Sequence, residues 1–351
     1  MYLFILPDFK IGGAERVIQT LITNLDSNKI DYELWILYNS GNKNNWKHLN
    51  PRILSNYKLI GYINFLFLKK TTYDYSISTH YFINYFLGLL RCFRLINVKL
   101  MCFRESTPFF QRKKGLIKFV FKIFHRLFYP YADKIIFQSK FMQDNFFENI
   151  ITCDPSRALI LKNPVLFKKI DRLKNENNTS IPLDINNSWV AMGRLIPEKG
   201  FDVLIRSYSQ FNNKFPKLYI FGNGPESKKL NALIDKLQVK EFIQIVNYQE
   251  NPYPIISKAR GCIVSSRIEG FPNILNEMIY LNSNVVSTIC VPEISGMKFI
   301  IRSLPNDVES LGNALCELNL SGNEFHKMNS LDRSNYLQQL EVSKYMSNII
   351  N

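Results

Sequence analysis

The sequence lacks most of the features that mark membrane and secreted proteins. No apolar run reaches about 18 residues, so no membrane-spanning helix is expected. The six cysteines form no Cys-x-x-Cys pair and no regular spacing, which favours reduced thiols in a cytoplasmic protein. The first residues, MYLFILPDF, contain neither a basic leader nor a small-residue cleavage site, and we therefore expect no signal peptide. No repeat with a period of roughly 20–50 residues is present, which excludes a solenoid.

The composition is that of a globular protein with room for two domains. At 351 residues the chain can bury two cores, and a hydrophobic content of 46% argues against disorder. The net charge of +15 is uneven. Residues 1–165 carry 23 Lys and Arg against 11 Asp and Glu, or +12, whereas the remainder carries 21 against 18, or +3. We therefore expect only the first half to meet an anionic surface, either lipid headgroups or nucleic acid.

Short apolar strands alternate with helical segments, and this order predicts parallel sheets covered by helices on both faces. The polar, Asn-rich stretch at 174–188 interrupts the alternation. We predict an α/β fold with two successive Rossmann-like domains, 1–165 and 166–332, followed by a helix at 333–351. The expected strands are Tyr2–Leu6, Tyr32–Tyr38, Tyr75–Ser78, Lys99–Phe103, Lys134–Gln138, Ala158–Leu161, Trp189–Met192, Lys217–Phe221, Phe242–Val246, Gly261–Ser265 and Asn284–Ser287. The expected helices include one after Gly13, one from Phe201, Glu226–Leu237, Tyr253–Lys258 and Asn273–Leu281.

The segment SRIEGFPNILNE carries two glutamates, Glu269 and Glu277, eight residues apart. Pro272 suits the first position of a helix, because proline has no amide hydrogen. The amides of Gly270–Asn273 would then form a helix N-terminus that favours an anion. The two carboxylates would be at most about 12 Å apart, a span that suits the two ends of a nucleotide sugar. A surface helix with two solvated glutamates is the alternative for this motif in isolation.

The segment GRLIPEKGFD places Arg194 and Lys199 on a loop directly after a strand. Ligands of open α/β sheets bind outside the carboxyl ends of strands, and an Arg fork with a Lys charge suits a diphosphate. A salt bridge between Arg194 and Glu198 is the alternative. Gly222 and Gly224 follow another strand and would let a phosphate approach the backbone. The third glycine of a dinucleotide motif is replaced by Ser227, so NAD is not expected.

In the first domain, Gly12 and Gly13 occupy a strand-to-helix turn, which is either a simple tight turn or a backbone surface for the transferred group. His80 follows a strand, where a ligand contact and a structural role are about equally expected. Arg104 and Glu105 end the next expected strand in the same way.

The segment RKKGLIKFVFKIFHRLFY at 112–129 contains six Lys or Arg and no acidic residue. Lys118, Lys122 and Arg126 recur every four residues and form a basic stripe on a helix rich in Phe and Ile. Such a helix fits the surface of an anionic membrane, and a solvated basic face over the core is the alternative. No recognised nucleic-acid module accompanies the charge.

These motifs together resemble the retaining glycosyltransferase family 4, the group 1 glycosyl transferases, in its bacterial surface-polysaccharide type. The likeness is densest from Val190 to Pro292, in VAMGRLIPEKGFDVLI, KLYIFGNGPE, NPYPIISKA, VSSRIEGFPNILNEM and VVST. It continues more weakly through IGGAERV, FQSKFM, KNPV and VSKYM. The resemblance implies a GT-B fold, in which two Rossmann-like domains face each other across a cleft and residues 333–351 return to the first domain.

The resemblance also implies roles for particular residues. Glu269 would bind the hydroxyls of the donor sugar and Glu277 the ribose, while Arg194 and Lys199 would hold the diphosphate. Gly13 and His80 would face the transferring sugar, and 246–250 would border the nucleobase. The expected catalytic residues are Glu269, Arg194, Lys199 and His80. The expected donor contacts are Gly12, Gly13, Gly222, Gly224, Val246, Tyr248, Gly270, Phe271, Pro272, Asn273 and Glu277, and the expected acceptor or membrane contacts are Arg104, Lys118, Lys122 and Arg126.

Two departures from the family pattern are expected to alter local structure only. Tyr280, Asn282 and Asn284 stand where the family has a small residue, a glycine and a proline, so the helix after Glu277 must end differently. Arg260 stands where the pattern prefers Asp. Neither change lies at an expected donor contact.

We therefore predict a retaining glycosyltransferase that takes a sugar from a nucleotide donor, expected to be UDP-linked, with no cofactor. No Asp-x-Asp motif is present to hold a metal beside the nucleotide, so basic side chains and helix amides would stabilise the leaving group. The expected acceptor is a lipid-linked saccharide in O-antigen, capsule or lipopolysaccharide assembly, and the expected location is the inner face of the cytoplasmic membrane. Same-face attack by the acceptor is favoured because no enzyme nucleophile is evident.

Two other functions remain open at this point. A nucleotide-sugar epimerase can share the architecture, and it would change the sugar's configuration without an acceptor. A non-catalytic protein that binds membranes through 112–129 would bind liposomes but show no stabilisation by UDP.

Overall fold

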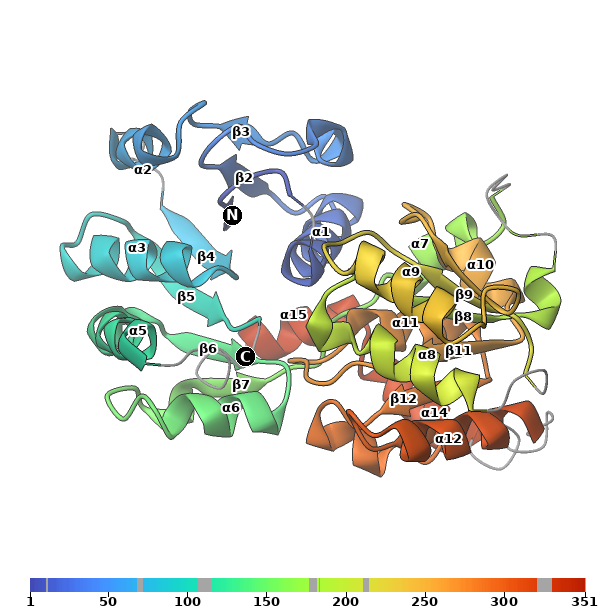
Figure 1. Cartoon of the computed structure of the whole chain (residues 1–351). Coiled ribbons are helices and arrows are strands. Elements are labelled where there is room, and N and C mark those ends of the chain that lie inside the picture. The colour runs from blue at the N-terminus through green and yellow to red at the C-terminus, as the bar shows by residue number, and fades with distance from the viewer. Residues whose placement is uncertain are drawn as a thin grey trace. The chain divides into compact units, whose positions relative to one another are not determined.

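The computed structural model describes residues 1–10, 12–67, 72–106, 115–176, 182, 184–210, 215–320 and 330–350. The chain divides into two compact units (Figure 1). Unit 1 comprises Met1–Pro164 together with Val342–Asn351, and unit 2 comprises Val165–Glu341. Each unit is built on one parallel β-sheet, which confirms the predicted α/β class.

Unit 1 contains a sheet in the order β3-β2-β1-β4-β5-β6-β7, and its neighbouring strands are all parallel. The first strand is buried along its whole length, as expected for a strand covered on both faces. The strands are β1 (Tyr2–Leu6), β2 (Tyr32–Ile36), β3 (Arg52–Ile53), β4 (Tyr73–Ser78), β5 (Val98–Arg104), β6 (Lys134–Phe137) and β7 (Ala158–Ile160).

Helices cover both faces of this sheet (Figure 1). They are α1 (Gly13–Ser27), α2 (Lys58–Phe67), α3 (Tyr81–Cys92), α5 (Gly115–Phe128), α6 (Lys140–Phe147) and α15 (Val342–Ile350). The helices α2, α3 and α5 lie in one row, joined by ring contacts between Tyr62 and Phe86 and between Tyr81 and Phe121. The helices α1 and α15 pack against each other.

Unit 2 contains a parallel sheet in the order β10-β9-β8-β11-β12-β13. The strands are β8 (Trp189–Met192), β9 (Leu218–Phe221), β10 (Ile243–Val246), β11 (Gly261–Val264), β12 (Val285–Thr288) and β13 (Ile301–Ser303). The helices are α7 (Phe167–Leu173), α8 (Phe201–Ser209), α9 (Ser227–Lys236), α10 (Tyr253–Lys258), α11 (Asn273–Leu281), α12 (Val308–Leu320) and α14 (Ser330–Gln338). Because β8 pairs with both β9 and β11, the loops that follow these strands lie side by side, at the point where the strand order reverses.

The predicted strands are confirmed to within two residues at each end. The strands β3 and β13 and the helices α6, α7 and α12 were not predicted. The strand β3 has only two residues and both are exposed, so it carries no apolar alternation. The strand β13 has three residues with the exposed Arg302 in the middle. Three residues are also too few to show an alternation of apolar and polar side chains.

The C-terminal segment differs from the single helix expected at 333–351. It forms α14 and α15, and only α15 belongs to unit 1. Within unit 2, the Tyr336 hydroxyl of α14 donates a hydrogen bond of 2.6 Å to Asn276 of α11. In unit 1, the Lys134 amine donates to the Ile349 carbonyl of α15 at 2.9 Å. These contacts assign the two helices to different units. Asn351 lies outside the described residues.

Candidate functional site

The loops that follow β8 and β11 bring Lys199 and Glu269 together. The Lys199 Nζ atom lies 2.5 Å from Glu269 Oε1, and the Ser266 hydroxyl donates to the same oxygen at 3.1 Å. The side chains of Lys199 and Glu269 are 19% and 17% exposed, so both can still reach a ligand. Two residues that the sequence predicted for the diphosphate and for the sugar therefore lie in contact.

Backbone geometry holds these two loops together. Gly200 has a φ of 65°, and a Cβ atom there would lie 2.1 Å from the Ser265 carbonyl oxygen. The Ser265 hydroxyl donates to the Lys199 carbonyl at 2.9 Å, and the Arg267 amide donates to the Glu198 carbonyl at 2.7 Å. Only glycine fits such an approach in the left-handed region, so Gly200 is required for the position of Lys199.

An ion pair reinforces the same contact. The Arg267 guanidinium donates two hydrogen bonds to the Asp202 carboxylate, at 2.9 and 2.7 Å. Burial opposes ionisation of Asp202, but the hydrogen bonds and charge of Arg267 outweigh it and lower the pKa of Asp202. The ion pair of Arg267 with Asp202 thus connects the first turn of α8 to the loop after β11.

Gly222 and Gly224 pack against the loop that carries Arg194. A Cβ atom on Gly222 would lie 1.9 Å from the Gly193 carbonyl oxygen, and one on Gly224 would lie 2.4 Å from the Leu195 carbonyl oxygen. The Leu195 amide donates to the Asn223 carbonyl at 3.0 Å. The two glycines therefore have a structural reason to be present, because they admit the backbone of the neighbouring loop.

Arg194 is exposed on this loop, whereas the adjacent Leu195 is 1% exposed. Of the ion pairs formed by the part of the chain that the structure describes, none joins Arg194 to Glu198. The alternative of an internal salt bridge is thus absent, and the guanidinium is accessible.

The helix α11 begins at Asn273, as predicted, and Pro272 is its N-cap rather than its first helical residue. Pro272 has a ψ of 110°, which is extended and not helical. Among the described residues, the amides of Gly270 and Phe271 donate to no backbone carbonyl, as is usual at the start of a helix. Glu277 lies on the second turn and is 9% exposed, and the Phe271 side chain is 4% exposed.

The end of α11 closes through side chains instead of a glycine. The Asn282 amide group donates to the carbonyls of Ile256 and Ala259 at 2.9 and 2.7 Å. The Arg333 guanidinium donates to the Ile279 carbonyl and, at 3.2 Å, to the Asn282 carbonyl. A cation at the C-terminus of a helix is favourable, so Arg333 supplies the capping that the family pattern assigns to a glycine and a proline.

Tyr280 and Arg260, which also depart from the family pattern, both have hydrogen-bond partners. The Tyr280 hydroxyl donates to Asp171 at 2.7 Å, and Arg260 donates to the Asn319 side chain at 3.2 Å. Neither contact involves Lys199 or Glu269.

The loop after β10 is fixed to the glycine loop. The Val246 carbonyl accepts from the Gly222 amide at 2.9 Å, and the Tyr248 amide donates to the Asn223 side chain at 3.3 Å. The Tyr248 ring is 53% exposed. The three loops that follow β8, β9 and β10 are therefore joined by backbone contacts.

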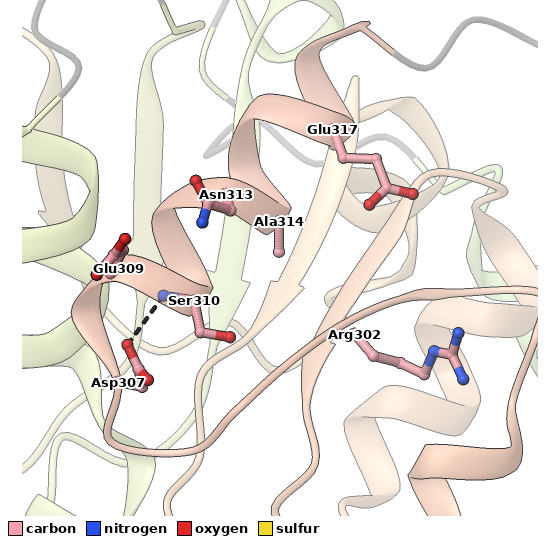
Figure 2. Close-up of a pocket in the computed structure, with 7 residues that line it drawn as sticks. All are labelled: Arg302, Asp307, Glu309, Ser310, Asn313, Ala314 and Glu317. Atoms are coloured by element: carbon pink, nitrogen blue, oxygen red, sulfur yellow. Dashed lines mark hydrogen bonds between the residues drawn. The ribbon is translucent and has the colours of Figure 1, made fainter.

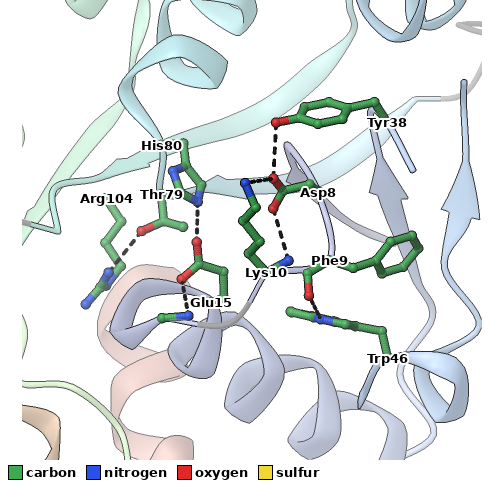
Figure 3. A network of polar contacts seen from close by, with 10 residues as sticks. Asp8, Phe9, Lys10, Glu15, Tyr38, Trp46, Thr79, His80 and Arg104 are labelled. Carbon is green, nitrogen blue, oxygen red and sulfur yellow. Dashed lines mark hydrogen bonds and ion pairs between the residues drawn. The ribbon is translucent and has the colours of Figure 1, made fainter. Parts of the chain in front are cut away.

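In unit 1, Glu15 links the Gly12 turn to His80 (Figure 3). Glu15 Oε2 accepts from the Gly12 amide at 2.9 Å, and Glu15 Oε1 lies 2.7 Å from His80 Nε2. Burial opposes ionisation of Glu15, but His80 and the backbone amides of Glu15 and Gly12 outweigh it and lower the pKa of Glu15. The sequence reasoning missed this residue, although a glutamate three positions after a helix start is the signal of a capping box.

The first strand-to-helix loop is anchored by residues that the sequence did not single out (Figure 3). The Asp8 carboxylate accepts from the Lys10 amide at 3.0 Å and from the Tyr38 hydroxyl at 3.1 Å. The Trp46 indole donates to the Phe9 carbonyl at 3.2 Å. Ile11 lies outside the described residues.

Arg104 is 1% exposed, where the sequence predicted an acceptor contact. Its guanidinium donates to Thr79 Oγ1 at 3.0 Å and to Asn163 Oδ1 at 2.5 Å. These bonds give Arg104 a structural role inside unit 1, and contact with an acceptor stays a prediction. The next residue, Glu105, is buried, and burial raises its pKa to about 7, although a hydrogen bond from Tyr129 and the charge of Arg104 act in the opposite direction.

The basic stripe at 118–126 lies on α5, as predicted, and Arg126 is exposed. The same helix exposes large apolar side chains, with Leu116 77% and Phe119 61% exposed. His125 is the only buried residue among the positions of α5. The residues 112–114 of the predicted basic segment lie outside the described residues.

A pocket of about 370 Å³ lies beside β13 and the start of α12 (Figure 2). Its lining contains the carboxylates of Asp307, Glu309 and Glu317 and the cation of Arg302. Carboxylates repel a diphosphate, and none of the residues predicted for the donor lines this pocket. We therefore do not assign the pocket to the nucleotide.

Within the described ranges, no group of three or more His, Cys, Asp and Glu side chains is arranged to hold a metal ion. Over the same ranges, no helix combines the length and the apolar character needed to cross a bilayer.

Comparison with known proteins connects this geometry to one group of enzymes. Residues 186–319 match the family model for group 1 glycosyl transferases. An uncharacterised glycosyltransferase of Methanocaldococcus jannaschii is 31% identical over 201 residues, which are 55% of this chain and 49% of the relative. The chain thus spans about half the length of that relative. An N-acetylgalactosamine-N,N'-diacetylbacillosaminyl-diphospho-undecaprenol 4-alpha-N-acetylgalactosaminyltransferase of Campylobacter jejuni is 28% identical over 79% of this chain and 77% of the relative.

The fold has a close likeness among solved structures. HepE of Anabaena, in a complex with UDP-glucose, superposes with a TM-score of 0.80 at 14% identity, over 99% of this chain and 98% of HepE. The two parallel-sheet α/β units are those of the GT-B class of glycosyltransferases. Over residues 186–319 the chain is similar to the group 1 glycosyl transferases.

Proposed function

We propose that this glycosyltransferase moves a sugar from a UDP-sugar to a lipid-linked saccharide acceptor with retention of configuration. The observation that carries the donor part is the contact between Lys199 and Glu269, on loops that follow adjacent parallel strands. A cation and a carboxylate at one point suit a ligand with a diphosphate next to sugar hydroxyls. The UDP-glucose complex of HepE and the shared fold support the same donor class.

In this proposal, Lys199 and the accessible Arg194 bind the diphosphate, together with the amides of Gly270 and Phe271 at the start of α11. Positive groups and helix amides neutralise the charge that develops on the departing nucleotide. Glu269 binds donor sugar hydroxyls and Glu277 binds the ribose. No metal is needed for these steps, and the acceptor hydroxyl attacks from the face that the nucleotide leaves.

The acceptor proposal draws on the relatives and on the surface of unit 1. The name of the Campylobacter relative specifies a saccharide on diphospho-undecaprenol. We propose an acceptor of that chemical class, used in surface-polysaccharide assembly such as O-antigen, capsule or lipopolysaccharide. A lipid-linked substrate requires the enzyme to work at the membrane surface.

The row of α2, α3 and α5 has the chemistry for that surface. None of the three helices contains an Asp or a Glu, whereas Lys118, Lys122 and Arg126 add positive charge. Their exposed apolar side chains include Leu59, Ile63, Phe67, Phe82, Leu116, Phe119, Ile123 and Leu127. Apolar side chains mixed with basic ones bind the interface of anionic lipids. We therefore propose peripheral binding to the inner face of the cytoplasmic membrane.

A direct transfer assay tests the function. Purified protein is incubated with a panel of nucleotide sugars and a diphosphate-lipid-linked saccharide, and the product and its anomeric configuration are read by NMR. We expect transfer from one UDP-sugar with retention, unaffected by EDTA, and loss of transfer in Lys199→Ala and Glu277→Ala. Full activity of both variants, or conversion of the donor sugar without an acceptor, would contradict the proposal.

A further inference from the structure

We infer that Glu15 is a positioning residue, whose carboxylate sets the orientation and the proton arrangement of the His80 ring toward the transferring sugar. The inference rests on the proposed function and on the expectation, implied by the family resemblance, that His80 faces the transferring sugar. It concerns the reaction step and not the binding of the nucleotide.

The two oxygens of Glu15 have different partners. Oε1 lies 2.7 Å from His80 Nε2, and Oε2 accepts from the Gly12 amide at 2.9 Å. A rotation of the carboxylate would break both contacts. Glu15 therefore joins two elements that are 65 residues apart in the chain, the Gly12 turn before α1 and the end of β4.

Glu15 is more deeply buried than His80, as expected if Glu15 holds the ring and His80 contacts the ligand. The Glu15 side chain is 11% exposed, whereas that of His80 is 30% exposed. Glu15 is thus enclosed and fixed, while the ring that it holds remains accessible to a ligand. His80 also starts α3 as its N-cap residue, so its backbone is fixed by that helix.

The chemistry of the pair determines where the ring proton lies. An ionised carboxylate can only accept hydrogen bonds, so His80 Nε2 must carry a proton in this contact. The other ring nitrogen, Nδ1, is then an acceptor in the neutral ring and a donor in the charged ring. Glu15 thereby selects one tautomer of neutral His80, as the carboxylate of a catalytic triad does for its histidine.

The surrounding loop supports a fixed geometry (Figure 3). The Phe9 amide donates to the Ser40 carbonyl at 2.7 Å, and the Trp46 indole holds the Phe9 carbonyl. The neighbouring cations have other partners, because Lys10 lies 3.5 Å from Asp8 and Arg104 donates to Thr79 and Asn163. Glu15 is therefore available to His80.

The close approach of Glu15 to Gly12 gives a second prediction that does not require a change at Glu15 itself. A Cβ atom on Gly12 would lie 2.8 Å from Glu15 Oε2, a distance that real Cβ contacts do not show. Gly12→Ala should therefore displace the carboxylate and reproduce the effect of a change at Glu15.

The test uses Glu15→Gln, His80→Ala and the double variant in the full-length protein. Glutamine keeps the size but loses the charge and the fixed acceptor. We expect kcat for transfer to fall about tenfold or more in Glu15→Gln, with the Kd for UDP unchanged. Replacement of a histidine-orienting carboxylate by an amide lowers kcat by as much as about 10⁴-fold in a serine protease. In the His80→Ala background, Glu15→Gln should cause no further fall in kcat. An equal fall in both backgrounds would overturn the inference, because it would show a structural role independent of His80.

A spectroscopic readout works even where kcat is too low to measure. Nitrogen-proton correlation spectra of the four histidine rings, with His80 assigned by its loss in His80→Ala, report the tautomer. We expect the Nε2-protonated form in the wild type and a mixture in Glu15→Gln. The same tautomer in both proteins would overturn the inference. A wild type that fails to bind UDP would instead contradict the proposed function, so the two failures are distinguishable.

Discussion

Lys199 and Glu269 are 70 residues apart in the chain, yet their side chains meet with an N–O distance of 2.5 Å. The contact exists because β8 and β11 are neighbouring parallel strands, whose following loops lie at one edge of the sheet. In the protein without ligand, the Lys199 ammonium group and the Glu269 carboxylate form an ion pair. In the proposed function, a diphosphate that binds Lys199 would share it with Glu269, and the hydroxyls of the donor sugar would give Glu269 new partners.

Glu269→Gln should separate nucleotide binding from transfer. The change removes a negative charge beside the diphosphate, so we predict that UDP binds more tightly, by a factor of about two to ten, equivalent to roughly 0.5–1.4 kcal/mol. Transfer should fall because a charged acceptor for the sugar hydroxyls is lost. Calorimetric titration with UDP and a transfer assay measure the two effects. A loss of UDP affinity in Glu269→Gln would contradict this role.

Gly222→Ala should displace the loop of Arg194. The added methyl group would lie 1.9 Å from the Gly193 carbonyl oxygen, which neither backbone can accommodate without moving. We predict a lower melting temperature and weaker UDP binding. Gly296→Ala is the matched control, because nothing lies within 4 Å of a Cβ atom there. Equal effects of the two changes would show that the close approach in the glycine loop is unimportant.

Glu105 should make the stability of the protein depend on pH. Its folded pKa is raised from 4.5 to about 7, so the folded state favours the neutral carboxyl group. The stabilisation is fully present below about pH 4.5 and is lost as the pH rises through about 7. Glu105→Gln is neutral throughout, so its stability relative to the wild type should rise by roughly 3 kcal/mol between pH 4 and pH 8, at about 1.4 kcal/mol per pKa unit.

Urea unfolding at the two pH values measures this difference. Burial lowers the pKa of His125 to about 4, which changes stability in the opposite direction. Because His125 is present in both proteins, its effect cancels in the comparison. A difference that is the same at pH 4 and pH 8 would refute the buried-carboxyl account.

The surface of α5 should bind anionic membranes. Replacement of Lys118, Lys122 and Arg126 by Glu is predicted to abolish sedimentation with vesicles that contain anionic lipid, because each basic residue contributes about 1 kcal/mol. A second variant, Leu116→Ser with Phe119→Ser, should weaken binding even at high salt, because it removes exposed apolar area. The control replaces the exposed Arg206, Lys228 and Lys236 of unit 2 by Glu. Equal loss in the control would indicate general charge attraction.

Much of the fold followed from the sequence, because strands such as Trp189–Met192 are short apolar runs between clear turn signals. The helix Asn273–Leu281 was also predictable, since Pro272 fixes where it begins. The strand β3 was not predictable, because its two exposed residues have no burial pattern to detect.

The candidate site was predictable in its residue types but not in its contacts. Sequence motifs were enough to select Arg194, Lys199 and Glu269 as candidates. The ion pair between Lys199 and Glu269 could not be predicted, because it depends on β8 and β11 being neighbours in the sheet. The buried state of Arg104 depends on Thr79 and Asn163, which are distant in the chain. The sequence predicts that the glycines at 222 and 224 let a phosphate approach the backbone, and this stays a prediction. The sequence did not reveal that their missing side chains also admit the adjacent loop.

Calorimetric titration of UDP and of uridine into the wild type and Lys199→Ala tests the central claim most directly. The claim is that Lys199 binds the diphosphate of the donor, so we predict that Lys199→Ala weakens UDP binding about tenfold or more, as expected for a lost charged hydrogen bond of roughly 1.5–3 kcal/mol. Uridine binding should not change, and the exposed Lys236→Ala should bind both ligands like the wild type. Unchanged UDP affinity in Lys199→Ala, or an equal loss for uridine, would contradict the account.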